Sequence, residues 1–276
     1  MSGGDNSILL IGESDVGKTH YGAQLLKRLM KGDGLLRMNG QASNLEPFEA
    51  ALESLNEGRA ADHTTFTTYV DSVWPIVDGR QRRATLVWPE YGGEQIKKMI
   101  VSRRITVAWE ERIRTARAWL MLIRLQQTRV EDDILSRPLA SLCGTTIENR
   151  EIQISDQARL IELIQMLMFV SSATERPIDR PRLGVLLTCW DELGLRGSPA
   201  EVLESRLPML AAFIRSNWHA PVVLGLSALG RSLNPHDRDQ EYIDRGPEKF
   251  GYVVQADGSQ SPDLTIPIEL LVDRAE

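Results

Sequence analysis

The chain has 276 residues, of which 42% are apolar and 25% are charged, a composition typical of a globular protein with one sizeable core. Its formal net charge of -6 gives no electrostatic reason to expect nucleic acid or an anionic membrane as the main partner. The cysteines Cys143 and Cys189 support neither a disulfide framework nor a cysteine metal site. Because no apolar run is long enough to span a membrane and no secretory pattern is present, we expect a cytoplasmic protein.

The predicted elements begin with a short apolar strand, Ser7 to Ile11, which is followed by a glycine-bearing loop and a helix with leucines at helical spacing. A second helix is expected around Glu46 to Asn56. Two β-like runs follow, Val70 to Val77 and Thr85 to Trp88. Between them, Asp78-Gly79 is a strong indicator of a hairpin.

The middle of the chain is less regular. Glu94 to Arg117 has helical, basic sequence, and Ala118 to Ile123 is typical of a fully buried strand. Glu131 to Glu151 shows no clear period, so we interpret it as an irregular insertion. Ser155 then has the position of a helix cap before the apolar helix Ala158 to Val170.

Two further buried strands are predicted, Leu183 to Leu187 and Val222 to Leu226, and the helical stretch Pro199 to Ser216 separates them. The chain closes with the segment Leu264 to Val272. Strands that alternate with helices imply an α/β fold, with a mainly parallel sheet and helices on both faces. We expect a single domain over residues 1–276, elaborated by a largely helical insertion at about 95–156.

The loop after the first strand carries the strongest motif. Gly12, Gly17, Lys18 and Thr19 satisfy the pattern G-x-x-x-x-G-K-[ST] between a strand and a helix. Backbone N–H groups would bind phosphate oxygens, Lys18 would bring positive charge and the Thr19 hydroxyl would reach Mg²⁺. An ordinary strand-to-helix turn with an exposed lysine is the alternative. The motif predicts a P-loop NTPase fold whose nucleotide-binding residues here are Gly12, Asp15, Val16, Gly17, Lys18, Thr19 and His20.

The segment WPEYGGEQ, Trp88 to Gln95, ends a strand and carries two glycines. It resembles the D-x-x-G segment of GTPases, with Glu90 in place of the usual aspartate. The resemblance implies that Glu90 supports the metal, that the backbone of Gly93 meets the γ-phosphate, and that Glu94 stands where a water-orienting glutamine often lies. A glycine turn after an edge strand is the alternative interpretation.

The segment LLTCWDEL, Leu186 to Leu193, ends another buried strand and resembles the [NT]-K-x-D element that reads guanine. Thr188 and Asp191 match the motif, whereas Cys189 replaces its lysine, and Trp190 could supply packing instead. A carboxylate at this strand end can accept hydrogen bonds from guanine N1–H and the 2-amino group, a pair that adenine lacks. A helix N-cap role for Asp191 is the alternative.

The segment GLSAL, Gly225 to Leu229, ends the next predicted strand and resembles the S-A-K element whose backbone meets guanine O6. Ser227, Ala228 and Leu229 hold the corresponding positions. Because these motifs follow in the order expected of a GTPase, GTP or GDP is the favoured bound nucleotide.

A switch segment that senses the metal is expected between the first helix and the strand leading to Glu90. This interval contains Thr64, Thr65, Thr67 and Thr68, and a hydroxyl there could complete the Mg²⁺ shell. We assign Thr65 to this role. The alternative is that the threonines simply favour the following strand.

The whole pattern is similar to the bacterial double-GTPase group of the translation-factor-like P-loop class. The similarity rests on the phosphate loop, an E-x-G-G-E segment, the T-x-x-D element and the terminal segment PDLTIPIELL. It implies a switch component of a prokaryotic conflict or antiviral defence system that acts through partner proteins.

For hydrolysis, Lys18 and Mg²⁺ would neutralise charge on the phosphoryl group while Glu94, or less favourably Gln95, orients the attacking water. Added charge could come from a partner's arginine or from one of Arg103, Arg104, Arg112 and Arg114. Two other hypotheses stay open. One is a non-hydrolysing module in which GTP orders the surface between residues 60 and 115, and the other is a P-loop ATPase or kinase.

Overall fold

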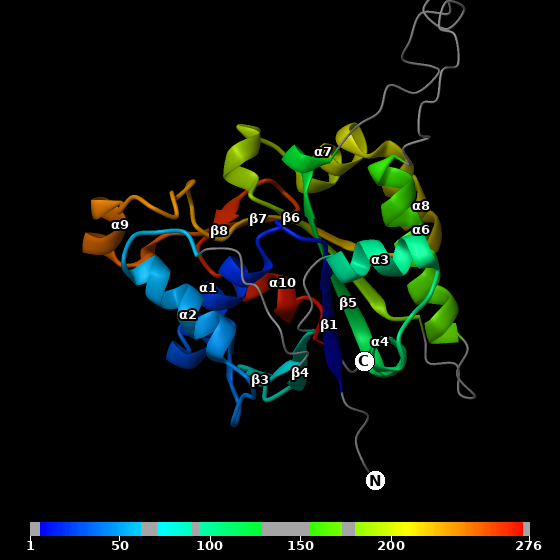
Figure 1. The fold of residues 1–276 in the computed structure, drawn as a ribbon, viewed down its shortest axis with the longest axis horizontal. Helices are drawn as coiled ribbons and strands as arrows, with labels where there is room; N and C mark the ends of the chain where they lie inside the picture. The colour runs from blue at the N-terminus through cyan, green and yellow to red at the C-terminus, as the bar shows by residue number, and fades with distance from the viewer. Residues whose placement is uncertain (1–5, 62–70, 90–93, 129–154, 173–179, 273–276) are drawn as a thin grey trace, which may run out of the picture.

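The computed structural model describes residues 6–61, 71–89, 94–128, 155–172 and 180–272. The described residues form one nine-stranded sheet between two layers of helices (Figure 1). The strands are β1 (Ser7–Gly12), β2 (Leu36–Met38), β3 (Ser72–Asp78), β4 (Arg83–Trp88), β5 (Ala116–Arg124), β6 (Arg182–Thr188), β7 (Val222–Ser227), β8 (Tyr252–Val254) and β9 (Gln260–Ser261).

The helices lie between these strands in the chain, as expected of an α/β fold. They are α1 (Lys18–Lys31), α2 (Glu46–Asn56), α3 (Glu94–Ser102), α4 (Val107–Thr115), α6 (Asp156–Ser172), α7 (Pro199–Arg206), α8 (Pro208–Asn217), α9 (Gln240–Arg245) and α10 (Ile266–Glu269), with short turns η1 (Leu125–Gln127), η2 (Trp190–Leu193) and η3 (Pro247–Lys249). None of the described helices is long and apolar enough to cross a membrane.

The order of strands in the sheet is β2-β3-β4-β1-β5-β6-β7-β8-β9. The central strands β4, β1, β5, β6 and β7 run parallel, whereas β2, β3, β8 and β9 add antiparallel pairs at the two edges. The α/β prediction with a parallel centre is therefore confirmed, and so is the hairpin at Asp78-Gly79, which joins β3 to β4. The edge strands β2, β8 and β9 were not predicted.

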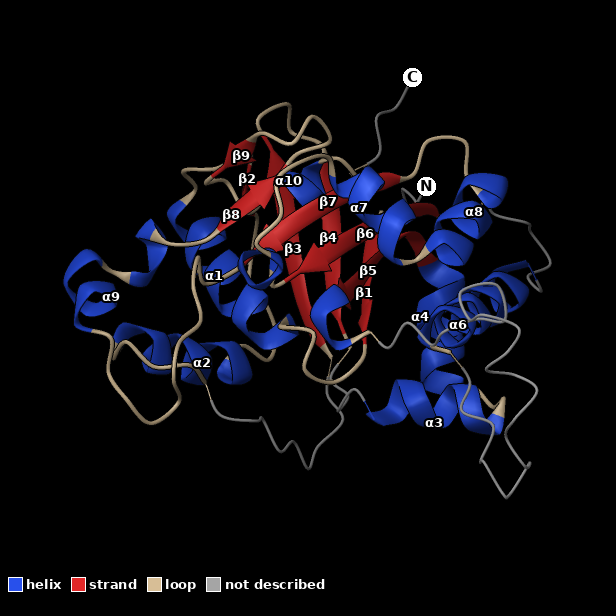
Figure 2. Ribbon diagram, turned by 90° about the horizontal axis from the view of Figure 1, so that it is seen from above, coloured by secondary structure: helices blue, strands red, loops and turns tan. Residues whose placement is uncertain are grey.

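Helices cover both faces of the sheet (Figure 2). Strand residues alternate between the faces, so β1 contributes Ile8 and Leu10 to one core and Leu9 and Ile11 to the other. The first core packs against α1, α2 and α10, and the second against α3, α4, α6, α7 and α8. All four of these β1 side chains are buried, which holds the end of β1 rigidly in the middle of the molecule.

Two predicted helical stretches are broken. The stretch from Glu94 ends at Ser102, and Arg103 adopts a left-handed backbone before Thr106 caps α4, so β5 begins earlier than predicted, at Ala116. The stretch from Pro199 breaks at Leu207, because Pro208 disfavours helical backbone in the residue before it. Ser155 caps α6 as predicted, with its Oγ accepting from the Ala158 N–H at 3.2 Å. The irregular insertion Glu131 to Glu151 lies outside the described residues.

Helix α1 is joined to the last third of the chain by buried hydrogen bonds. The Tyr21 hydroxyl donates to the Leu264 carbonyl at 3.0 Å. The Gln24 Nε2 donates to the Tyr242 hydroxyl at 3.0 Å, and the Arg28 guanidinium donates to the Phe250 carbonyl at 2.8 Å. The face of α1 that these residues share is therefore completed by the segment 242–264.

Trp190 packs beneath the turn after β6, and Gly225 of β7 makes room for it. The indole is 3% exposed, and a Cβ added at Gly225 would lie 2.5 Å from its Cε3 atom. This contact couples β7 to the turn that contains Asp191. Whether Trp190 also takes over the packing of the missing lysine stays a prediction.

Replacing Gly225 with alanine should destabilise the fold, because Trp190 must move to admit the new methyl group. We expect the free energy of unfolding to fall by about 1–3 kcal/mol, the usual cost of overpacking. Chemical denaturation followed by tryptophan fluorescence measures this change. Gly79→Ala is the matched control, because nothing lies within 4 Å of its added Cβ, and equal losses for the two variants would contradict the packing argument.

Candidate functional site

The loop from Gly12 to Lys18 joins the buried strand β1 to helix α1 in a tight turn. A Cβ at Gly12 would lie 2.9 Å from Val16 Cγ2 and 3.1 Å from Leu122 Cβ, so only glycine fits there. Gly17 has a φ of 77°, in the left-handed region that glycine favours, and Asp15 has a φ of 63°. The two glycines of the motif are thus explained by the path of the backbone.

The start of α1 is suited to an anion. Gly17 is the N-cap and no side chain caps the helix, whose first turn contains no acidic residue. The N–H groups of the first turn lack helical partners and carry a partial positive charge, so a phosphate group fits this position. Thr19 lies half-buried in the same turn, which suits a hydroxyl ligand of a phosphate-bound Mg²⁺. Within the described ranges, no group of three or more His, Cys, Asp or Glu side chains forms a metal site.

Lys18 folds back over the loop. Its Nζ donates to the Gly12 carbonyl at 2.8 Å and also to the Glu13 carbonyl. Burial lowers the pKa of Lys18 to about 8, although the carboxylates of Asp15 and Glu13 act in the opposite direction. A bound phosphate would favour the charged form, so the lysine is suited to an anionic ligand.

His20, in the first turn of α1, contacts Ala61, the last described residue before residues 62–70. Its Nε2 accepts from the Ala61 N–H at 3.0 Å. Burial, together with the positive charge of Arg124, lowers the pKa of His20 to about 4, so the ring is neutral at physiological pH. The threonines proposed for the metal switch, including Thr65, lie outside the described residues.

The second part of the site lies at the ends of β6 and β7. The Ser227 hydroxyl donates to Asp191 Oδ1 at 2.5 Å and accepts from the Gly230 N–H at 2.9 Å. Ser227 is fully buried, and Asp191 also acts on Tyr252, whose pKa is raised by burial and by this carboxylate. The two residues predicted to read guanine are therefore in direct contact.

The neighbouring motif residues have their expected places at the same strand ends. Thr188 is the buried last residue of β6, and Ala228 and Leu229 form the half-buried turn after β7. Asp191 is not an N-cap, because η2 begins at Trp190 with Cys189 as its cap residue. Cys189 has a left-handed backbone, with a φ of 52°.

Three other predicted residues belong to the segment after β4. Glu90 and Gly93 lie outside the described residues. Glu94 is the first residue of α3, the next described element after β4. Its role in orienting water stays a prediction.

The arginines considered for catalysis are mostly engaged elsewhere. Arg112 and Arg114 lie just before β5, whose first residue, Ala116, pairs with Ser7 at the start of β1. The phosphate loop is at the opposite end of β1, about 16 Å away for a strand of this length. Arg112 contacts Asp71 at 2.6 Å. Both arginines are therefore poorly placed for catalysis, because they lie near the start of β1 and the phosphate loop follows its end.

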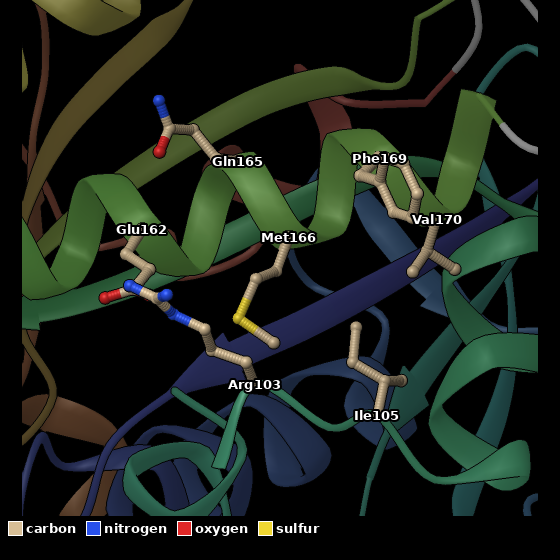
Figure 3. A pocket seen from close by; sticks show the side chains of 7 residues that line it. All are labelled: Arg103, Ile105, Glu162, Gln165, Met166, Phe169 and Val170. Carbon is tan, nitrogen blue, oxygen red and sulfur yellow. The ribbon is translucent and has the colours of Figure 1, made fainter. Parts of the chain in front are cut away.

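Arg103 lines a shallow groove between α6 and the turn that joins α3 to α4 (Figure 3). Its Nε donates to Glu162 Oε1 at 2.8 Å, and Met166 and Phe169 supply the apolar wall. None of the phosphate-loop or guanine-motif residues lines this groove. Arg104 is exposed in the same turn.

Two arginines that the motifs did not indicate contact the phosphate loop. Arg159 of α6 binds Glu13 through two hydrogen bonds of 2.8 and 2.9 Å, and Arg124 donates to the Asp15 carbonyl at 3.0 Å. Arg124 could have been found as the charged residue that ends a buried strand. No sequence pattern marks Arg159, because it lies 146 positions from Glu13 and meets it only in the folded protein.

Comparisons with known proteins agree with this geometry. A protein-family model described as Double-GTPase 1 matches residues 9–271. No curated protein sequence matches the chain.

Three solved structures are similar at low identity. They are a bacterial selenocysteine-specific elongation factor EF-Sec (14% identity, 81% of this chain and 26% of that chain, TM-score 0.37), the signal recognition particle receptor SRb-GTP/SRX complex from Chaetomium thermophilum (13%, 83% and 93%, TM-score 0.38) and the mammalian SRP receptor (15%, 80% and 91%, TM-score 0.33). The chain thus spans about a quarter of the elongation factor. The family model instead matches almost the whole chain, and on that match the protein belongs to the Double-GTPase 1 family.

Proposed function

We propose that this protein is a guanine-nucleotide switch that binds GTP with Mg²⁺, hydrolyses it and acts through partner proteins. The observation that carries the proposal is the contact between Ser227 and Asp191 beside a phosphate loop. The serine fixes one oxygen of the carboxylate, which limits its rotation. An oriented carboxylate at this position can accept from guanine N1–H and the 2-amino group together, and adenine offers no such pair.

At the phosphate end, the proposal assigns binding to the loop backbone around Asp15, Val16 and Gly17 and to the Lys18 ammonium. Thr19, with Thr65 and Glu90, would hold Mg²⁺, which supplies positive charge to the phosphate oxygens. The backbone of Gly93 would meet the γ-phosphate. Ala228 and Leu229 would present backbone N–H groups to guanine O6, and Thr188 and His20 would line the base and phosphate regions.

In the proposed hydrolysis, water attacks the γ-phosphorus, the bond from that phosphorus to the bridging oxygen of GDP breaks, and inorganic phosphate leaves. Glu94 orients the water, and Lys18 stabilises the charge that develops on the bridging and γ-phosphate oxygens. The two glutamates at 90 and 94, which replace the residues usual in GTPases, favour a second candidate function. In it, bound GTP orders a partner surface and is not hydrolysed. A place in a prokaryotic defence system stays a prediction from the family resemblance.

Binding of fluorescent GTP in the presence of Mg²⁺, competed by unlabelled GTP and ATP, tests the nucleotide assignment. GTP should compete at least a hundredfold better than ATP, because a site built to pair with specific hydrogen-bond donors rejects a base that lacks them. Lys18→Ala should lose binding, since the positive charge at the phosphates is removed. Equal competition by ATP would reduce Asp191 and Ser227 to structural residues.

Asp191→Asn should move the base preference from guanine toward xanthine. The amide can donate to the 2-oxo group of xanthine, whereas it repels the 2-amino group of guanine. Competition by xanthosine triphosphate against GTP measures the change. A variant that keeps the wild-type preference would show that Asp191 does not contact the base.

Glu94→Ala should lower the rate of phosphate release about a hundredfold, the lower end of the range for loss of a group that assists proton transfer or positions water. Nucleotide affinity should stay unchanged, since the proposed contact is with water. Single-turnover release of phosphate measures the rate, and Lys98→Gln on the exposed side of α3 is the matched control. If wild-type protein releases no phosphate even with its partner present, the non-hydrolysing function is supported instead.

A further inference from the structure

The turn after β6 lacks the lysine that the guanine element usually contains. Cys189 occupies that position, and its Sγ lies 3.7 Å from where a Cβ on Gly17 would stand. Burial raises the pKa of the Cys189 thiol to about 12, so the side chain is neutral. Position 189 therefore packs against the phosphate loop but brings no charge to it.

A cation reaches the same place from the neighbouring strand. Arg124 is the last residue of β5, which lies between β1 and β6, and it pairs in register with Thr188. Its Nη1 donates to the Asp15 carbonyl at 3.0 Å. Its Nε and Nη2 donate to the two carboxylate oxygens of Glu192, with the Nε bond at 2.9 Å. One guanidinium thus joins the phosphate loop to the residue that follows Asp191.

The geometry requires an arginine. A planar guanidinium can bind a carboxylate with two parallel N–H groups and still present another N–H to a carbonyl oxygen. The hydrogen bonds to Glu192 raise the pKa of Arg124, so the bridge keeps its charge. Arg124 and Glu192 are each about one-quarter exposed, which leaves the bridge partly shielded from solvent.

We propose that Arg124 is a positioning residue that replaces the missing lysine and couples phosphate binding to base recognition. The inference rests on the proposed function and deepens it. Phosphates that order the loop around Asp15 also fix Arg124, and through Glu192 they fix the turn that holds Asp191. The two ends of a guanine nucleotide therefore bind with positive coupling.

The test measures affinities and dissociation rates of Mg²⁺-GDP for wild type, Arg124→Gln, Glu192→Gln and the double variant. We expect each single variant to bind about tenfold more weakly, mainly through faster dissociation. The double variant should lose little more than either single one, because both belong to one bridge. Arg124→Lys should be intermediate, since one ammonium cannot reproduce the fork. Arg215→Gln, which breaks an exposed ion pair between α7 and α8, is the matched control and should match wild type.

A second readout separates positioning from general stability. The ratio of affinities for GTP and inosine triphosphate reports how well Asp191 meets the 2-amino group, and it should shrink severalfold in Arg124→Gln. Unchanged GDP binding, additive losses in the double variant, or an unchanged ratio would overturn the proposal. Wild-type protein that binds no guanine nucleotide would overturn the proposed function itself, which is a distinguishable result.

Discussion

Parallel pairing of β1, β5, β6 and β7 is the constraint on which the candidate site depends. Strands that run side by side in the same direction end at the same edge of the sheet. Here the residues gathered at that edge are Gly12, Arg124, Thr188 and Ser227. These four residues come from distant parts of the sequence, and no local motif would bring them together without this strand order. The rigidity of the buried centre then fixes the distances between the groups proposed to bind phosphate and those proposed to bind the base.

Much of the centre of this arrangement could be predicted from the sequence. The apolar runs of β1, β5, β6 and β7 predicted that Asp191 and Ser227 follow neighbouring strands at one edge of the sheet. The hydrogen bond between these two side chains was not predicted. The short edge strands β2, β8 and β9 could not be found, because two or three residues show no period. Helix breaks at Arg103 and Leu207 depend on single residues inside otherwise helical sequence.

Contacts between side chains of distant elements were the hardest feature to predict from the sequence. Arg124 is a single charged residue after a strand, and only the register of β5 against β6 shows that it meets Glu192. Arg159 binds Glu13 from α6, 146 positions later in the chain. The loop proposed to bind phosphate contains two acidic residues, Glu13 and Asp15, and these two arginines contact both of them. Arg159 neutralises the carboxylate of Glu13, and Arg124 holds the backbone of Asp15.

The hydrogen bonds that join α1 to the segment 242–264 have a consequence for the order in which the protein is made. Domains fold as units while the chain emerges from the ribosome, with the N-terminal part appearing first. Gln24 and Arg28 are buried polar groups, and their partners Tyr242 and Phe250 lie 218 and 222 positions later in the chain. A nascent chain that already contains the phosphate loop still leaves this face of its helix unsatisfied. The helix that follows the phosphate loop is thus completed only after the segment 242–264 has been made.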